Sequence, residues 1–171
     1  MRMRGAGAVS VAAAAVLVAI GLTGCAAQAP VVRLAGGTTS CVPDAAAKPG
    51  IMAVAFHNTT GGAISVTGAS IAGTNVETAD VWVLDGTSAQ RTEVDYGIEP
   101  FSTLNRWSTR QKVGSVTIAA GKWASIAVSF TFHGGSVEGA EVTGITMKYR
   151  AANGATGTAE STASGAYSTE C

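Results

Sequence analysis

Short runs of alternating apolar and polar residues follow one another along most of the chain and are separated by glycine-rich turns. In the run 123–132, large apolar residues occupy every second position and serine or threonine the positions between them, which predicts a half-buried β-strand. The pair Asn153-Gly154 supplies the positive φ values of a tight hairpin turn. Further strands are predicted over residues 51–57, 64–71, 76–84, 113–118, 142–150 and 155–161.

A helical domain is the alternative, and the pattern argues against it. After residue 41 no period near 3.6 residues is found, and frequent glycine would destabilise helix interiors by about 1 kcal/mol each. About seven short strands within residues 41–171 predict instead a single all-β domain. A domain of this kind is a two-sheet sandwich or a small barrel.

The N-terminus has the pattern of an export signal. Arg2 and Arg4 precede an uncharged stretch of Ala, Val and Gly, and the sequence LTGC ends at Cys25. This arrangement resembles the signals of bacterial lipoproteins. It implies a cleaved signal peptide over residues 1–24, a lipid such as palmitate carried on Cys25, and anchoring on the extracytoplasmic face of the cell membrane. The alternative is an uncleaved membrane helix, for which the apolar stretch is short.

The composition limits the classes of partner. With 47% hydrophobic residues, 22 glycines and a formal net charge of zero, the chain is not disordered, collagen-like or a coiled coil. Loss of Arg2 and Arg4 with the signal peptide leaves nine basic residues against 11 acidic ones, a net charge of minus two. No basic block remains, so nucleic-acid binding is not expected.

Seven Arg against four Lys, with abundant Ala and Gly, is typical of a high-GC bacterium such as an actinomycete.

Two cysteines remain once Cys25 is assigned to the lipid. An even pair in an exported chain predicts a disulfide between Cys41 and Cys171, which would close nearly the whole domain into one loop. In the chain-entropy model such a bridge stabilises the fold by about 4 kcal/mol. Two free thiols are the alternative. Residues 25–40 are small and nearly uncharged and predict a flexible tether, although Val31 to Leu34 could form a first strand.

Two segments, FHNTTGGAISVTGASI and VTIAAGKWASIAVSFTF, resemble strand-turn-strand segments of bacterial immunoglobulin-like domains. In those domains an Asn ends one strand and a Gly precedes another, and Asn58 and Gly121 occupy these places here. The resemblance implies an immunoglobulin-like antiparallel β-sandwich, and the whole chain is similar to small actinobacterial surface lipoproteins. No activity follows, because such sandwiches host many functions.

Few residues are arranged for catalysis or metal binding. His57 and His133 each follow a predicted strand, and on antiparallel neighbours these strand ends lie at opposite poles, which excludes a shared site. Met52 and Met147 lie within strands and are expected in the core. Acidic residues are scattered, and no phosphate-binding loop is present. We therefore expect no catalysis, no cofactor and no metal.

Residues 86–112 differ from the rest of the chain. They hold four of the nine basic residues that follow the signal peptide and three of the ten aromatic residues. Long connections are often functional, and Tyr, Trp and Arg anchor interfaces. One hypothesis is a recognition surface for another envelope protein or a cell-wall glycan, with these candidate residues: Arg91, Tyr96, Phe101, Arg106, Trp107 and Arg110. The alternative is that Phe101 and Trp107 fold back over an open end of the sandwich.

The sequence thus predicts a lipid-anchored protein of binding or accessory type, foremost a protein-interaction module. A small-ligand or glycan binder is the second interpretation, and an apolar pocket lined by Trp82, Trp123 or Tyr149 would favour it. An enzyme or a metal chaperone is a remote third.

Overall fold

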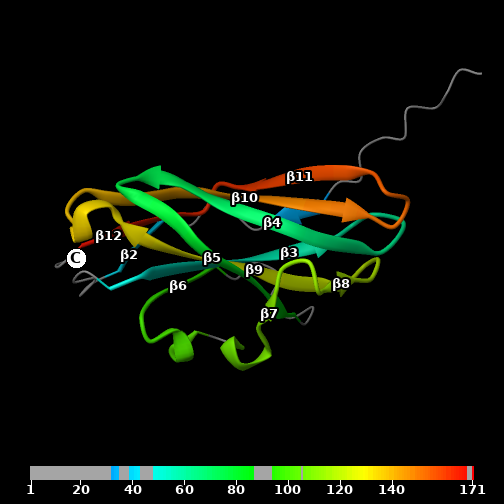
Figure 1. The fold of residues 1–171 in the computed structure, drawn as a ribbon, viewed down its shortest axis with the longest axis horizontal. Coiled ribbons are helices and arrows are strands. Elements are labelled where there is room, and N and C mark those ends of the chain that lie inside the picture. Colours follow the sequence, from blue (N-terminus) through cyan, green and yellow to red (C-terminus); the bar gives the residue numbers. More distant parts are fainter. Residues whose placement is uncertain (1–31, 35–38, 43–47, 87–93, 105, 169–170) are drawn as a thin grey trace, which may run out of the picture.

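The computed structural model describes residues 32–34, 39–42, 48–86, 94–104, 106–168 and 171. Cys25, the predicted signal peptide and Arg91 lie outside this part of the chain. The described residues form β-strands and three-residue 3-10 helices, arranged as two six-stranded sheets that pack face to face (Figure 1). The predicted all-β sandwich is confirmed. None of the described helices is long and apolar enough to cross a membrane.

The first sheet is built around the two long strands β3 (Gly50–Asn58) and β9 (Trp123–Phe132). Its remaining strands are β1 (Val32–Leu34), β5 (Val76–Asp85), β6 (Val94–Ile98) and β7 (Gln111–Lys112). The strand order is β1-β3-β9-β5-β7, and β6 also pairs with β3. All of these pairs are antiparallel.

The second sheet is built around β4 (Ile64–Thr74) and β10 (Ala140–Ala151). Its remaining strands are β2 (Thr39–Val42), β8 (Thr117–Ile118), β11 (Thr156–Ser161) and β12 (Ser164–Tyr167). The order is β2-β12-β10-β4-β8, and β11 also pairs with β10. The pair of β2 and β12 is parallel, which departs from the purely antiparallel sandwich expected.

The topology is that of an immunoglobulin-like domain. In such domains strands A, B, E and D form one sheet and strands C, F and G the other. Here β1-β3-β9-β5 takes the place of A-B-E-D, and β4-β10-β11 takes the place of C-F-G. The predicted immunoglobulin-like arrangement is therefore confirmed by the order of the strands.

The core lies between the two sheets and follows from the alternation of side chains along the long strands. Met52 on β3, Phe130 on β9 and Met147 on β10 are fully buried, so the expectation that both methionines pack in the core is confirmed. Phe130 meets the ring of Tyr167 edge-on, with 5.0 Å between ring centroids. The Tyr167 hydroxyl donates a hydrogen bond to the Ile51 carbonyl at 3.0 Å and so links the two sheets.

The expectation of about seven strands is too low, since the described residues form twelve. Five short strands, β1, β2, β6, β7 and β12, have only two to five residues each, too few to show an alternating pattern. The predicted strand 113–118 is a strand only at Thr117–Ile118. Strand β1 and the first half of β2 lie within residues 25–40, so this part of the expected tether belongs to the sandwich.

Two other expectations are confirmed by the strand positions. Cys41 and Cys171 form a disulfide with Cα atoms 5.9 Å apart. His57 pairs with Trp123 at the start of β9, whereas His133 follows the far end of that strand. The two histidines therefore lie at opposite ends of the first sheet.

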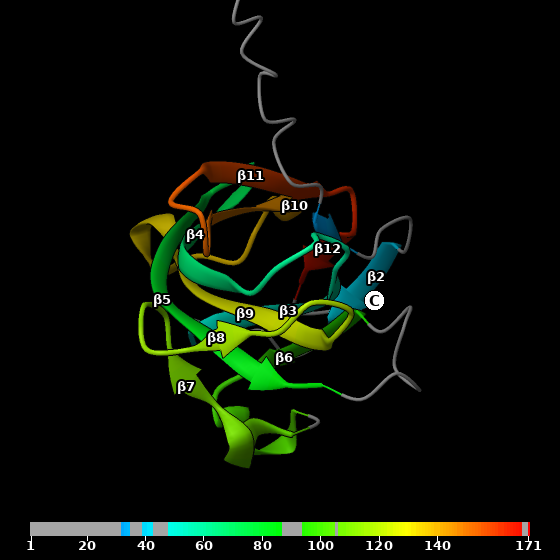
Figure 2. The same ribbon diagram turned by 90° about the vertical axis from the view of Figure 1, so that its right-hand side faces the viewer.

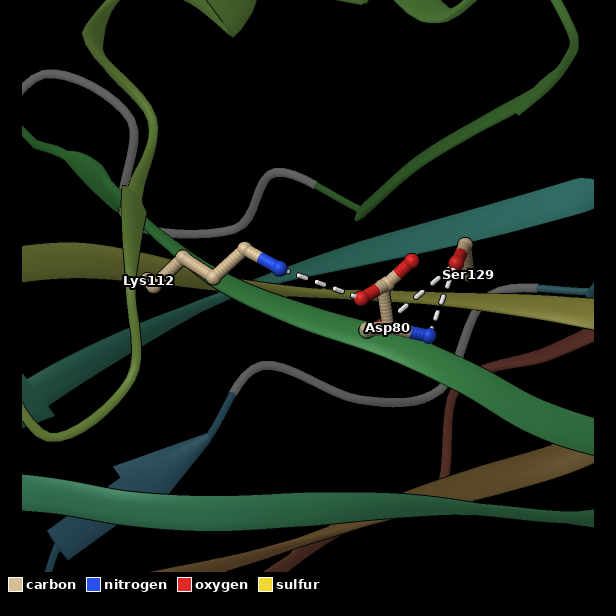
Figure 3. A network of polar contacts seen from close by, with 3 residues as sticks. All are labelled: Asp80, Lys112 and Ser129. Carbon is tan, nitrogen blue, oxygen red and sulfur yellow. Dashed lines mark hydrogen bonds and ion pairs between the residues drawn. The ribbon is translucent and has the colours of Figure 1, made fainter.

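The expected half-burial of β9 is wrong. Ser125 and Ser129, on the face opposite Phe130, are only 4% and 3% exposed. At Ser129 the adjacent strand β5 bulges, so that the backbone N–H of Asp80 donates to the Ser129 hydroxyl at 3.1 Å (Figure 3). Further along the strand, the described residues 99–104 and 106–110 cover the same face of the sheet. A third layer therefore buries the outer side of the first sheet.

Candidate functional site

The third layer consists of the described residues 99–104 and 106–110, which we call the insert layer. It contains the 3-10 helices η2 (Phe101–Thr103) and η3 (Trp107–Thr109). The edge strands β6 and β7 of the first sheet connect this layer to the sheet. The ribbon leaves the edge of the first sheet at β6, passes across the outer face of this sheet and returns to its other edge at β7 (Figure 2). The second sheet lies on the opposite side of the molecule.

The insert layer is held by an apolar cluster separate from the main core. Leu104 of the insert forms one cluster with the outward side chains of Ile51 and Ala53 on β3, Ala127 on β9 and Leu84 on β5, and each is no more than 5% exposed. Burial of apolar surface stabilises the folded state by about 25 cal/mol per Å². The layer is therefore a packed part of the domain.

Three aromatic rings gather over this cluster. Trp107 meets Trp82 of β5 edge-on at 5.0 Å between centroids and Phe101 of η2 edge-on at 5.5 Å. All three side chains pack against the apolar cluster and remain partly exposed. Phe101 and Trp107 thus fold back onto the domain, as the alternative hypothesis expects. They cover the face of a sheet, however, and not an open end of the sandwich.

An exposed cation completes this aromatic cluster. The guanidinium carbon of Arg110 lies 4.7 Å from the centre of the Trp107 ring, and Arg110 Nη1 donates to the Trp107 carbonyl at 3.1 Å. A cation over the face of a tryptophan is stabilised by about 0.5–1 kcal/mol at an exposed site. The interaction holds Arg110 and the ring in a fixed mutual orientation on the surface.

The sequence suggested Arg106 as a residue of the recognition surface, but its side chain points inward. Its Nη2 donates to the hydroxyl of buried Ser125 on β9 at 3.0 Å, and its Nε and Nη1 atoms are also buried. Arg106 adopts the left-handed conformation, with φ of 59°, just before η3. Its carbonyl accepts a hydrogen bond from the Thr109 hydroxyl at 2.8 Å. Arg106 therefore positions η3 on the sheet.

Tyr96 also has a structural role, since it connects the two sheets. Its hydroxyl donates to the Ser164 carbonyl at 2.7 Å and so connects β6 of the first sheet with β12 of the second. A Cβ atom at Gly165 would lie 2.7 Å from Cε1 of the Tyr96 ring, so glycine at this position leaves room for the ring. Of the six candidate residues, the structure brings Phe101, Trp107 and Arg110 together on the surface. Arg106 supports the layer from within, whereas Tyr96 packs against the core between the two sheets.

A charged pair lies beside the aromatic cluster. Lys112 on β7 pairs across the strands with Trp82, and its ammonium lies 3.4 Å from a carboxylate oxygen of Asp80 (Figure 3). Both side chains are well exposed, at 75% and 55%. Exposed pairs contribute little to stability, typically below 1 kcal/mol. The pair places one positive and one negative group at the rim of the cluster.

The residues suggested for an apolar pocket do not come together. Trp82 belongs to the aromatic cluster, whereas Trp123 stacks on His57, with ring centroids 4.5 Å apart and 4° between planes. Tyr149 lies on β10 in the second sheet, and burial raises the pKa of its hydroxyl. Within the described ranges, no three His, Cys, Asp or Glu side chains are close enough to hold a metal ion.

No family model and no curated protein matches the chain. Among solved structures, the chain is similar to the ASH / PapD-like domain of human CEP192, PapD-like domain 7, with 7% sequence identity and a TM-score of 0.37. This match covers 84% of the present chain and 88% of the CEP192 chain.

Proposed function

We propose that this protein is a non-catalytic interaction module, held on the extracytoplasmic face of the cell membrane by a lipid on Cys25, and that the aromatic cluster of the insert layer binds another envelope protein. We define the binding face by Trp82, Phe101, Trp107 and Arg110. The single observation that carries this proposal is the convergence of two tryptophans, a phenylalanine and an exposed arginine at one place on the surface.

The composition of this face is that of a protein interface. Trp, Tyr and Arg are enriched among the few residues that dominate binding energy, and such residues cluster at the centre of an interface. The rings are already held in place by the apolar cluster beneath them. Little conformational entropy is therefore lost when a partner docks.

Site-specific photo-crosslinking tests the partner. We would place the crosslinking residue at Ser108, which is exposed and lies next to Trp107 in η3, because Trp107 itself packs on the sheet. In living cells that make the full-length protein, we expect one saturable protein adduct, and we expect Arg110→Ala to weaken it.

The matched control places the same crosslinker at Ala120, an exposed turn residue outside the insert layer. An identical adduct from both positions, or none from Ser108, would show that the aromatic cluster is not a protein-binding face. An adduct on cell-wall glycan alone would establish the second interpretation in its place.

The lipid anchor is tested separately. The proposal is supported by the LTGC sequence that ends at Cys25, seven positions before the first residue of β1. Cells fed an alkyne-bearing fatty acid should label the wild-type protein and leave the Cys25→Ser variant unlabelled and outside the membrane fraction. Equal labelling of the two proteins would refute lipidation at this residue.

A further inference from the structure

The outer face of the second sheet carries a hollow of about 420 Å³. It lies over β4, β10 and β11, which run side by side in the layer farthest from the insert (Figure 1). The residues that line it are Thr67, Lys148, Tyr149, Thr156, Gly157 and Thr158. Because it lies on the other side of the molecule from the aromatic cluster, it is a separate candidate site.

A β-bulge in β4 helps to form this hollow. Tyr149 of β10 pairs with Val66, but the neighbouring Lys148 pairs with Gly68, so Thr67 is an extra residue in β4. Bulges of this kind redirect a side chain and are common next to binding sites. Thr67 is exposed and lines the hollow beside Lys148.

Glycine at position 68 keeps the space beside Lys148 open. A Cβ atom built at Gly68 would have no atom of another part of the protein within 4 Å. Gly68 also has no positive φ that would require glycine. The absence of a side chain at this position therefore leaves free volume beside the residue that pairs with Lys148.

The hollow combines positive charge with hydroxyl groups. Lys148 and Arg150 are both exposed on the same face of β10, and within the described ranges the side chain of neither makes an ion pair or a hydrogen bond. Across the neighbouring strand β11, Thr158 pairs with Lys148 and Thr156 with Arg150. An ammonium donates three hydrogen bonds, and each threonine hydroxyl both donates and accepts.

We propose that this hollow binds an acidic sugar, that is, a saccharide unit that carries a carboxylate or a phosphate group. The ammonium of Lys148 pairs with the anionic group, with Arg150 adding to the positive potential. The hydroxyls of Thr67, Thr156 and Thr158 hydrogen-bond to the hydroxyls of the sugar. The assignment does not depend on the aromatic cluster, so the two proposals can fail independently.

Nuclear magnetic resonance of the ¹⁵N-labelled full-length protein in detergent tests the ligand class. The probes are glucuronic acid for a carboxylate, glucose 6-phosphate for a phosphate, neutral glucose and inorganic phosphate. We expect saturable amide shifts confined to β4, β10 and β11 with one or both acidic sugars, with dissociation constants near ~1 mM because a small ligand in an open site binds weakly.

Glucose and inorganic phosphate should each bind at least about tenfold more weakly than the preferred acidic sugar. If glucose bound as tightly as the acidic sugar, the charge of the ligand would play no part in binding. If inorganic phosphate bound as tightly as the acidic sugar, the hollow would be a general anion site. Either result would overturn the proposal. Amide shifts that do not saturate with any probe would also overturn it.

Two variants test the hollow itself. Gly68→Leu fills the space without removing a charge, and Lys148→Met removes the charge with little change in size. Each is expected to weaken binding of the acidic sugar at least about tenfold. The matched controls are Ala72→Leu, at an exposed position further along β4, and Lys122→Met, at an exposed turn, and both should bind as the wild type does.

The melting temperature of each variant shows whether it has folded. A folded Gly68→Leu protein that binds the acidic sugar as the wild type does would refute the site. Loss of binding in the control variants to the same extent would also refute it.

Discussion

The two outer faces of this sandwich differ in what covers them. On the first sheet the outward residues of β9 are small, Ser125, Ala127 and Ser129, and the insert layer packs over this sheet. On the second sheet the outward residues of β10 include Lys148 and Arg150, and both are exposed. Small side chains allow a third layer to approach the backbone closely, whereas long charged ones keep a face in solvent.

The comparison also separates two kinds of candidate site. The covered face presents aromatic rings that rest on an apolar cluster, which suits a flat protein partner. The open face presents hydroxyls and cations around a hollow, which suits a small polar ligand. One domain can thus carry two recognition surfaces on opposite sides.

The largest expected effect comes from the side chain that fixes the third layer. Leu104→Ala removes a side chain that is 5% exposed between the insert and the first sheet. We expect the free energy of unfolding to fall by about 2–4 kcal/mol, measured by urea denaturation. Thr158→Ala, on the open face, is the control and should change it by less than about 0.5 kcal/mol. Similar values for both variants would mean that the insert adds no stability.

Buried tyrosines in the core between the two sheets should make the free energy of unfolding fall at alkaline pH. Burial raises the pKa of Tyr167 above its usual value, and burial also raises that of Tyr149. Above pH 10 the tyrosines of the unfolded chain lose their protons first, so the unfolded state is favoured as pH rises further. The loss is about 1.4 kcal/mol per pH unit for Tyr167, which stays protonated in the folded state over this range.

This pH dependence can be measured by urea denaturation between pH 8 and about pH 11. Tyr167→Phe removes one of the raised pKa values and should make the decline less steep, although it also removes the hydrogen bond to Ile51. An unchanged slope in that variant would contradict the assignment to Tyr167.

Substitutions of Trp107 and Arg110 distinguish the role of the covered face in packing from its proposed role in binding a partner. Trp107→Ala removes a partly exposed ring that contacts Trp82 and Phe101. It should lower the free energy of unfolding by about 1–2 kcal/mol and the melting temperature by several degrees. Arg110→Ala should lower the melting temperature by about half as much as Trp107→Ala does, because only the cation–π contact and one exposed hydrogen bond are lost, yet weaken the partner adduct. The reverse order of the two melting temperatures would show that the guanidinium, and not the ring, holds the layer.

The smallest effect is expected at the rim. Asp80→Asn removes the exposed ion pair with Lys112 and should change the free energy of unfolding by less than about 0.5 kcal/mol. The difference from wild type should disappear at about 1 M salt, where such charges are screened. A change above 1 kcal/mol would mean that the pair supports β7 more strongly than its exposure indicates.

Much of the fold is readable from the sequence because the central strands are long. Strand β9 has ten residues, enough to show its alternation, and its bounds match the predicted run 123–132. Strands such as β7, with two residues, carry no periodic signal and form only because the sheet provides a neighbour. The disulfide could be predicted because two cysteines remain once Cys25 is assigned to the expected lipid.

Besides the unusual composition of residues 86–112, the third layer had a signal in the strand beneath it. Residues 51–56 are apolar without interruption, which is typical of a strand that is buried on both faces, and the structure covers both faces of β3. The inward position of Arg106 had no such signal. It depends on a left-handed backbone conformation and on Ser125, a residue on a strand distant in sequence.

The disulfide between Cys41 and Cys171 also has a mechanical meaning. A pull on the N-terminal end of the chain first loads β1, whose three residues pair with the end of β3. The load then reaches Cys41, where it divides between β2 and the C-terminal end of the chain. Residues 41–171 form a covalent loop, so tension arriving from the N-terminal side cannot draw the sandwich out from that end alone.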